Sequence, residues 1–232
     1  MPVIEVERVT HTYGDRPGAR RVLDEVSVRI DERRVGVVGA NGSGKSTFVR
    51  MLNGLVLPTS GSVRVADLDP DKQGRLVRHR VGFCFTDPDA QIVMPTVAED
   101  VAFGLRRRKL AKDVVAAKVA DALAAYGLDG HADHPAHLLS GGQKQLLALA
   151  SVMVTEPDVL VMDEPTTLLD LRNATKVSRV VAELPTQVLL VTHHLDLLDG
   201  YERVLVFEAG RIVCDDVPAV AVPFYRSLME QA

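Results

Sequence analysis

The chain has 232 residues, of which 47% are hydrophobic and 25% charged, so we expect a folded protein with one large α/β domain. Its net charge of −4 gives no general argument for binding nucleic acid or an anionic membrane surface. The two cysteines, Cys84 and Cys214, are too few for a disulfide framework and favour a reducing cytoplasm. Neither a signal peptide nor an apolar run near ~20 residues is apparent, so any membrane role is expected to depend on a partner.

The first thirty residues predict two strands. Residues 3–9 and 26–30 alternate apolar and polar side chains, and we expect the two strands to pair in antiparallel fashion. The connection between them is predicted to be a loop that contains Tyr13, Gly14, Pro17 and Gly18.

The next stretch, Gly39-Ala-Asn-Gly-Ser-Gly-Lys45-Ser46-Thr47, fits the phosphate-binding pattern G-x-x-x-x-G-K-[ST]. An apolar strand at 35–38 precedes it and a helix over 48–54 follows, as the motif requires. Its glycines let backbone N–H groups point at phosphate oxygens, and the helix N-terminus adds partial positive charge. Lys45 would meet the β- and γ-phosphates, and the Ser46 hydroxyl can ligate Mg²⁺. The predicted ATP-binding residues here are Gly39, Asn41, Gly42, Ser43, Gly44, Lys45, Ser46 and Thr47.

The middle of the chain is predicted to change from strands to helices. In order, we expect a turn at 58–61, strands at 62–65 and 81–85, a polar loop at 86–91, and a mostly helical segment over 97–137 with one helix from Lys112 to Tyr126. The basic run Arg106–Lys109 is interpreted as a solvated helix face, with contact to lipid headgroups or a membrane partner as the alternative.

Three histidines, His131, His134 and His137, raise the question of a metal site. Their spacing is irregular for ligands and Pro135 breaks any helical register, so we interpret them as solvated loop residues.

The last third of the chain predicts alternating strands and helices. Ser140 opens a helix that runs to Met153, strands follow at 159–162 and 187–192, a hairpin is formed by 203–207 and 211–214, and a short helix covers 218–232. The strand at 159–162 ends in Asp163-Glu164, and the strand at 187–192 ends in His193.

Leu139-Ser-Gly-Gly-Gln143, the phosphate loop and Val159-Leu-Val-Met-Asp-Glu164 together resemble the motifs of ABC transporter ATP-binding subunits, and the resemblance covers nearly the whole chain. It implies an α/β fold: a RecA-like P-loop NTPase core with an antiparallel β subdomain and a helical (ABC signature) subdomain. A single ABC ATPase domain over 1–232 is expected, with the helical subdomain at about 90–155. The resemblance also implies that two subunits pair head to tail around two ATP molecules and hydrolyse them.

The resemblance assigns roles to residues around the bound nucleotide. Tyr13 would stack on adenine, with a half-buried structural tyrosine as the alternative. Asp163 would hold Mg²⁺ together with Ser46. Glu164 would be the general base, and catalysis would also need Lys45 and His193, the latter at the γ-phosphate. His194 is interpreted as a bystander, because neighbouring side chains at a strand end point apart.

Other residues are expected to act on the nucleotide of the opposite subunit or at the subunit interface. Ser140, Gly141, Gly142 and Gln143 would form the contact with that γ-phosphate, and Asp170 would lie in the loop that crosses between the subunits. A plain helix cap is the alternative interpretation of Ser-Gly-Gly. Leu168 stands where the family mostly has a small residue, which would alter the packing of the two subunits.

Thr86 departs from the family pattern. A glutamine that touches the Mg²⁺ and water region usually follows this strand, and the threonine hydroxyl does not reach as far. We therefore expect Thr86 to replace that contact only in part. Gln91, five positions on, matches a second glutamine seen in one branch of the family and need not substitute for it.

The subtype is indicated by Asp87-Pro-Asp-Ala-Gln91 and the following run Pro95–Gly104, which resemble the energy-coupling-factor (ECF) importers of vitamins and transition-metal ions. Glu32-Arg33-Arg34 further resembles the ATPase of the biotin member. The implied partners are a transmembrane coupling subunit, a substrate-binding membrane protein and a second ATPase subunit, identical or paralogous, at the cytoplasmic face of the cell membrane. We expect the coupling subunit to dock on residues 86–104, with Glu99 and Asp100 contributing to assembly.

The spacing of the motifs and the number of ATPase halves in the chain argue against two other classes of ABC protein. The gap from Lys45 to Ser140 has no room for the long coiled coil of ABC ATPases that act on DNA, and translation factors usually carry two ATPase halves. No nucleic-acid partner is therefore expected. A different ABC importer, or an exporter, is the closest alternative.

Overall fold

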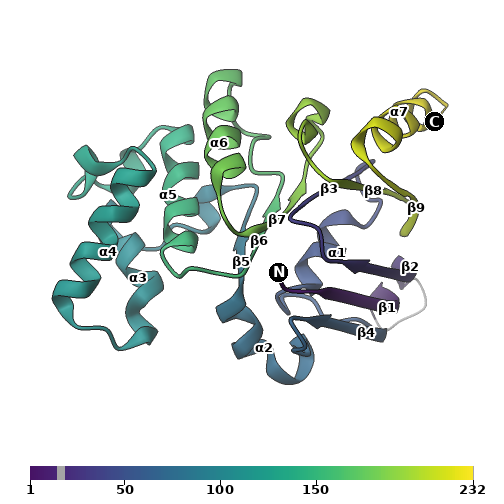
Figure 1. The fold of residues 1–232 in the computed structure, drawn as a ribbon, viewed down its shortest axis with the longest axis horizontal. Coiled ribbons are helices and arrows are strands. Elements are labelled where there is room, and N and C mark those ends of the chain that lie inside the picture. Colours follow the sequence, from purple (N-terminus) through teal and green to yellow (C-terminus); the bar gives the residue numbers. More distant parts are fainter. Residues whose placement is uncertain (15–18, 232) are drawn as a thin grey trace. The chain divides into compact units, whose positions relative to one another are not determined.

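The computed structural model describes residues 1–14 and 19–231, so the predicted loop positions Pro17 and Gly18 lie outside the described residues. The chain forms two compact units (Figure 1). We call residues 1–81, 158–163 and 186–232 the core unit, and residues 82–157 and 164–185 the helical unit. Each unit is described by itself.

The core unit contains a three-stranded antiparallel sheet. Its strands β1 (Ile4–Tyr13), β2 (Arg20–Ile30) and β4 (Ser60–Val65) lie in the order β2-β1-β4. The alternating pattern predicted the antiparallel pairing of the first two strands, but both are longer than predicted, and Tyr13, expected in the loop between them, belongs to the first strand and pairs with Arg20. Ile4 pairs with Ile30 on one side and with Val65 on the other, and all three side chains are buried. The predicted turn at 58–61 is partly wrong, because Ser60 and Gly61 already belong to β4. Gly61 has a φ of 86° and lies against the β1 backbone, where a side chain would clash.

A second sheet of the core unit carries the predicted strand ends. Its strands in this unit are β3 (Arg34–Gly39), β6 (Val159–Asp163), β7 (Gln187–Val191), β8 (Arg203–Glu208) and β9 (Arg211–Asp216), in the order β6-β7-β3-β8-β9. Neighbours from β6 to β8 are parallel, and β8 and β9 form the predicted hairpin. β3, β6 and β7 are buried along their whole length, as central parallel strands should be. Their carboxyl ends therefore meet at one edge of the sheet.

Three helices complete the core unit: α1 (Lys45–Met51), α2 (Pro70–Arg80) and α7 (Pro218–Glu230). Phe48 of α1 packs against Phe207 of β8 with ring centroids 5.0 Å apart. The sequence interpretation missed α2, although its start carries a recognisable signal. Asp69 accepts hydrogen bonds from the backbone of residues 71 and 72, and proline follows it at the first helical position.

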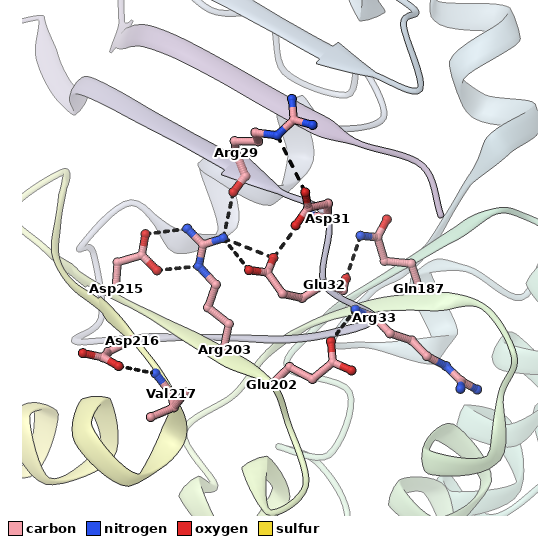
Figure 2. Close-up of polar contacts among 10 residues, drawn as sticks. All are labelled: Arg29, Asp31, Glu32, Arg33, Gln187, Glu202, Arg203, Asp215, Asp216 and Val217. Atoms are coloured by element: carbon pink, nitrogen blue, oxygen red, sulfur yellow. Dashed lines mark hydrogen bonds and ion pairs between the residues drawn. The ribbon is translucent and has the colours of Figure 1, made fainter.

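A network of charged residues joins three segments of the core unit (Figure 2). Arg203 of β8 binds Asp215 of β9 in bidentate fashion at 2.5 and 2.6 Å, and Glu32 at 2.8 Å. The hydrogen bonds that Arg203 donates to Asp215 raise the pKa of its guanidinium, which therefore stays charged. Arg34 is buried at the start of β3 and donates to the carbonyl oxygen of Thr186 at 2.7 Å. Glu32 and Arg34, two of the residues that resemble the biotin member, thus stabilise the start of β3.

The helical unit begins within β5 (Val81–Cys84) and contains four α-helices. They are α3 (Val97–Leu105), α4 (Lys112–Ala125), α5 (Gly141–Met153) and α6 (Leu171–Glu183). α3 packs on α4 and α5, and α5 packs on α6 (Figure 1). The predicted end of α4 is confirmed: Tyr126 caps it and Gly127 follows with a φ of 66°.

The basic run Arg106–Lys109 is largely solvated, as the sequence suggested: Arg106, Arg107 and Lys109 are exposed and Arg108 is half-buried. Its first three residues form a single 3₁₀ turn after α3. The guanidinium of Arg106 lies 5.5 Å from the ring centre of Phe103, and Arg108 donates to the carbonyl oxygen of Thr155. Part of the run is therefore used inside the helical unit.

Two further sequence expectations can be checked here. Neither cysteine is paired, and burial raises the pKa of the Cys84 thiol to about 12, which keeps it protonated. Among the described residues, no helix is both long enough and apolar enough to cross a membrane.

Candidate functional site

The predicted phosphate loop joins β3 to α1 and has the backbone shape that its glycines allow. Gly42 and Gly44 have φ values of 79° and 105°, a region that disfavours other residues. A Cβ atom at Gly44 would lie 2.7 Å from the carbonyl oxygen of Val22, so this position also lacks space for a side chain. The backbone N–H of Ser43 donates to the carbonyl of Ala40 at 3.2 Å and closes the turn. The loop is thus a tightly folded glycine turn at a parallel strand end.

Lys45 lies across this loop. Its side chain is only 4% exposed, and Nζ donates to the carbonyl oxygens of Gly39 at 2.6 Å and Ala40 at 2.8 Å. Burial of an ammonium group is costly unless hydrogen bonds compensate it, and the two carbonyls do so. The arrangement holds a full positive charge inside the loop, where it would meet a phosphate group.

Ser46 and Asp163 are brought together from opposite halves of the sequence. The Ser46 hydroxyl, in the first turn of α1, donates to Oδ1 of Asp163 at 2.8 Å. Asp163 ends β6, pairs with Val191 of β7 and is 1% exposed. A hydroxyl and a carboxylate are oxygen ligands of the kind that Mg²⁺ prefers, so the pair fits the predicted metal role.

Arg50 is a neighbour of this pair that the sequence interpretation did not identify. Its Nη2 atom lies 3.0 Å from Oδ2 of Asp163, which is the carboxylate oxygen that Ser46 does not bind. The signal was present, because Arg50 follows Ser46 by four residues and so lies on the same face of α1. Arg50 thus holds the carboxylate in place from the second side.

Tyr13 ends β1 beside the phosphate loop. Its hydroxyl lies 3.4 Å from Oγ1 of Thr47, and 47% of the residue is exposed. The ring of His11 meets it edge-on, with centroids 4.5 Å apart and planes at 86°. The tyrosine is therefore held on one edge while much of its surface stays accessible, a geometry that suits stacking on a planar base.

His193 and His194 follow β7, the strand between β6 and β3. The hydroxyl of Thr192 accepts the backbone N–H of His194 at 3.0 Å, which fixes the chain at this point. His193 is half-buried and His194 is exposed, as expected for neighbouring side chains that point apart. His193 thus leaves the same sheet edge as the phosphate loop and Asp163.

In the helical unit, Ser140 begins α5 with a reciprocal cap. Its Oγ accepts the backbone N–H of Gln143 at 3.3 Å, and Oε1 of Gln143 accepts the backbone N–H of Ser140 at 2.9 Å. Ser140 and Gly141 are exposed, whereas Gly142 is buried against Asn173 of α6. A Cβ atom at Gly142 would lie 2.9 Å from Cβ of Asn173, so glycine is needed there for packing as well.

Glu164 and Asp170 stand at the two ends of a short loop before α6. Glu164 has a φ of 55°, an unusual conformation for a residue with a side chain, and its Oε2 accepts the Thr167 hydroxyl at 3.2 Å. Such backbone strain costs of order 1–3 kcal/mol and is concentrated at functional sites. Asp170 caps α6 and accepts both the backbone and the side-chain N–H of Asn173, at 2.8 and 3.0 Å. Leu168 between them is 64% exposed.

The loop after β5 contains the departure at Thr86. Thr86 itself is half-buried. Gln91 uses both ends of its amide inside the helical unit: Oε1 accepts the backbone N–H of Phe85 at 3.1 Å, and Nε2 donates to the carbonyl of Ala148 at 3.4 Å. With both ends engaged, Gln91 is a structural residue of this loop and no substitute for the usual glutamine.

Two expectations about the helical unit are wrong. His131 and His134 are half-buried rather than solvated, and only His137 of the three is exposed. Within residues 1–14 and 19–231 no group of three possible ligands is placed to hold a metal ion, so the alternative metal site is not supported either. His131 is partly buried because it lies close to α5. The composition of the loop does not predict this contact.

The second wrong expectation is that Asp100 contributes to assembly together with Glu99. Glu99 forms a capping box with Thr96 at the start of α3. Asp100 is 4% exposed; its Oδ1 accepts the backbone N–H groups of Val93 and Met94, at 2.8 and 3.0 Å, and its Oδ2 accepts the Ser151 hydroxyl at 2.8 Å. The buried Asp100 therefore holds the fold of this unit and offers no docking surface, whereas Glu99 is exposed and its part in assembly stays a prediction.

Comparison with protein-family models matches residues 23–167 to the family described as ABC transporter. A Deinococcus radiodurans protein, named provisionally as an ABC transporter ATP-binding protein, is 52% identical over 98% of this chain and 99% of its own length. Proteins named biotin transport ATP-binding protein BioM are also similar. The one from Rhizobium etli is 46% identical over 91% of this chain and 94% of its own, and the one from Rhodobacter capsulatus is 40% identical over 99% and 97%.

Solved structures are similar over the same length. CbiO1 of Clostridium perfringens, described as part of the ABC transporter complex CbiONQ, superimposes with a TM-score of 0.84 at 30% identity, covering 98% of this chain and 93% of its own. An ATP-binding cassette solved as a dimer with ADP and inorganic phosphate gives 0.81 at 26% identity, covering 93% and 98%.

Proposed function

Because the chain belongs to the ABC transporter family and is an ATP-binding, ATP-hydrolysing member with the P-loop ATPase fold, we propose that it powers an ECF-type importer. The substrate class is a vitamin or metal ion, with biotin as the first candidate. The observation that carries the proposal is the 46% and 40% identity, over more than nine-tenths of the chain, to proteins named for biotin transport. The structural similarity to CbiO1 supports the ECF type and leaves a metal ion as the second candidate.

The proposal includes partners and a place in the cell. A transmembrane coupling subunit and a substrate-binding membrane protein would complete the importer, and a second ATPase subunit, identical or paralogous, would complete the catalytic pair. This chain would then lie peripherally at the cytoplasmic face of the membrane. In this proposal the chain is one domain over residues 1–232, with a helical subdomain at about 90–155. That domain would make all of the chain's contacts with these partners.

Nucleotide binding would be the task of the core unit. Gly39, Gly42 and Gly44 let the loop approach the phosphates closely, and the buried Lys45 ammonium offsets their charge. Asn41, Ser43 and Thr47 would complete the loop, and Tyr13 would stack on the adenine. Mg²⁺, held by Ser46 and Asp163, would neutralise charge that develops on the transferred phosphoryl group. Arg50 would keep the Asp163 carboxylate oriented toward that position.

Hydrolysis would need a base and a γ-phosphate contact. Glu164 would take a proton from the attacking water, and its hydrogen bond from Thr167 keeps one carboxylate oxygen oriented. His193 would hold the γ-phosphate as charge moves onto it. Asp163 and Glu164 are adjacent in the sequence and would have different roles. Asp163 would bind the metal, and Glu164 would move the proton.

The exposed start of α5 supports a head-to-tail pair of subunits. Ser140 and Gly141 are exposed, yet the reciprocal cap with Gln143 fixes their backbone. A fixed helix N-terminus with a hydroxyl suits a phosphate that arrives from another molecule. Asp170 and the exposed Leu168 would lie at the same interface.

Coupling to the membrane partner would use the loop after β5, because contacts tie this loop to α5. Lys144 of α5 pairs with Asp89 at 2.7 Å, and Gln91 donates to the carbonyl of Ala148. A movement of α5 on ATP binding would therefore be carried into residues 86–104. ATP shifts this equilibrium by its higher affinity for the closed pair.

Exposed apolar side chains give a better docking candidate than the two acids. Val93 is 60% exposed and Phe103 is 45% exposed, both in the segment predicted to dock. Apolar side chains of this size on a surface frequently mark contact with another protein. Phe103→Ser should therefore weaken copurification with the coupling subunit while ATP binding by the isolated subunit stays unchanged.

The deciding experiment is purification of the tagged protein from membranes of its own host, with identification of every subunit. Uptake of labelled biotin, and separately of labelled Co²⁺ or Ni²⁺, is then measured in cells with wild-type protein and with Lys45→Ala. Loss of biotin uptake alone supports the first candidate, and loss of metal uptake alone supports the second. Copurification with an exporter-type membrane protein would overturn the ECF proposal.

A further inference from the structure

His131 contacts the glutamine of the ABC signature. It ends the 3₁₀ turn Asp129–His131, and its Nε2 lies 3.0 Å from the amide nitrogen of Gln143. The contact is partly buried, and it is made by a residue outside the signature itself. The signature motif therefore has a partner that its own five residues do not supply.

The hydrogen bonds around Gln143 fix the roles of the atoms. Oε1 of Gln143 already accepts the backbone N–H of Ser140, so the amide group facing His131 is the NH₂ donor. Nε2 of His131 must then accept, which requires a neutral imidazole with its proton on Nδ1. That Nδ1 is buried and has no hydrogen-bond partner among the described residues.

We propose that His131 is a positioning residue for the signature. The Gln143 amide has two orientations that differ by exchange of its oxygen and its nitrogen. The backbone N–H of Ser140 needs Oε1 as its acceptor and so decides which orientation is present, and the NH₂ group then donates to His131. His131 therefore anchors the Gln143 amide from its other end and keeps Oε1 of Gln143 on the Ser140 backbone. This inference rests on the proposed role of Ser140 and Gln143 at the partner subunit's nucleotide.

The neighbouring His134 supplies a matched control. Its ring centre lies 5.8 Å from that of His131, and its Nδ1 lies 3.0 Å from the carbonyl oxygen of Pro135. That bond places its proton on Nδ1 and engages it with its own loop. His134 has the same chemistry and similar burial as His131, and no hydrogen bond joins it to Gln143 in the described part of the chain.

The test compares ATP-driven dimer formation with ATP binding by the monomer. All variants are made in the Glu164→Gln background, and dimers are measured by analytical ultracentrifugation against ATP concentration. Binding to the monomer is measured with a fluorescent ATP analogue. His131→Leu removes the acceptor and His131→Gln returns an oxygen acceptor at a similar reach. His131→Met, of intermediate length and without a strong acceptor, replaces His131→Leu if that variant does not fold.

We expect His131→Leu to raise the ATP concentration for half-maximal dimerisation by ~5-fold or more, about the effect of one hydrogen bond. Monomer binding should stay unchanged, His131→Gln should return to the parent value, and His134→Leu should match it. Dimerisation of His131→Leu like the parent, or failure of a folded His131→Gln to restore it, would overturn the inference. Absence of ATP-driven dimers in the Glu164→Gln parent would instead overturn the proposed function of the signature, and this inference with it.

Discussion

The phosphate loop in the core unit and the signature in the helical unit are both anion-binding candidates at the start of a helix, and they differ in exposure. Lys45 and Asp163 are 4% and 1% exposed, and the groups that they bind in the phosphate loop and α1 lie in the same unit. Ser140, Gly141 and Asp170 are exposed. The first set is built to enclose a ligand within one chain, whereas the second is presented at a surface.

Exposure does not mean that the second set is loose. Ser140 is fixed by its cap with Gln143, and Asp170 is fixed by two hydrogen bonds from Asn173. Asn173 also packs against Gly142, so the two exposed loops are held against each other inside the helical unit. A surface that is exposed and also rigid loses little conformational freedom when a partner binds. We therefore expect substitutions in the first set and substitutions in the second set to cause defects that different assays detect.

The largest effect is expected at Glu164, which directly follows the enclosed Asp163. Glu164→Gln should lower the turnover of ATP by ~10²- to 10⁴-fold, because it removes a general base, while ATP binding is retained. The ATP-bound dimer should accumulate, as gel filtration with ATP would reveal. Glu183→Gln is the matched control, since Glu183 is an exposed acid of the same unit without an assigned role. Wild-type turnover in Glu164→Gln would remove this residue from catalysis.

Gly142→Ala tests how tightly the exposed set is packed. Its new methyl group would clash most severely with Oδ1 and Cγ of Asn173, the atoms that Asn173→Ala removes. Overpacking of this kind should lower the free energy of unfolding by ~1–3 kcal/mol, measured by urea denaturation. Gly141→Ala is the control, because its methyl group would have its nearest neighbour, Leu169, at 3.8 Å. The double variant Gly142→Ala/Asn173→Ala should recover part of the loss; if it recovers none, the clash is not the cause.

Tyr13 lies beside the phosphate loop and is accessible, so its substitution tests the first set. Tyr13→Ala should weaken ATP binding by ~1–3 kcal/mol, the usual contribution of a base stacked on an aromatic ring. Tyr13→Phe keeps the ring and loses only the 3.4 Å contact with Thr47, so its affinity should stay close to wild type. Isothermal titration calorimetry with both variants separates stacking from the hydroxyl contact. Equal affinity of Tyr13→Ala and the wild type would leave Tyr13 as a structural residue of β1.

The smallest effect is expected at Thr86, where the sequence departs from the family pattern. Thr86→Gln should raise turnover, or lower the Mg²⁺ concentration needed for it. The effect should correspond to the free energy of a single hydrogen bond, ~1 kcal/mol or less. Thr86→Val should lower turnover if the hydroxyl has a role. Steady-state ATPase assays across Mg²⁺ concentrations, with and without the membrane partner, would measure both. Identical kinetics in all three proteins would mean that position 86 carries no catalytic role here.

The elements that the sequence predicted well are those with a strong local signal. Local signals predict β3, the phosphate loop, α4 and α5, because glycine conformations, caps and periodicity are properties of neighbouring residues. The missed helix α2 also had a local signal, in Asp69 and Pro70, that was not used. The errors at Ser60 and Gly61 arose because β1 pairs with residues whose composition suggests a turn.

Contacts between distant residues could not be predicted in the same way. The sequence interpretation assigned Arg50 no role, placed His131 in solvent and placed Asp100 at a docking surface. Each of them instead makes a specific, partly buried hydrogen bond. Charge and composition do not reveal such partners, because a polar side chain is buried only where the fold brings a matching group to it.

The sequence by itself determined the family and the P-loop ATPase fold and predicted which residues act in ATP hydrolysis, because the three motifs fix backbone shape and functional groups over a few consecutive positions. The tertiary structure decided how those groups are held. Parallel pairing of β6, β7 and β3 brings the Asp163 carboxylate to Ser46 and Arg50, and the packing of the helical unit brings His131 to Gln143. Hydrogen bonds act over about 3 Å whereas these residues lie up to 117 positions apart, so only the folded chain can make them neighbours.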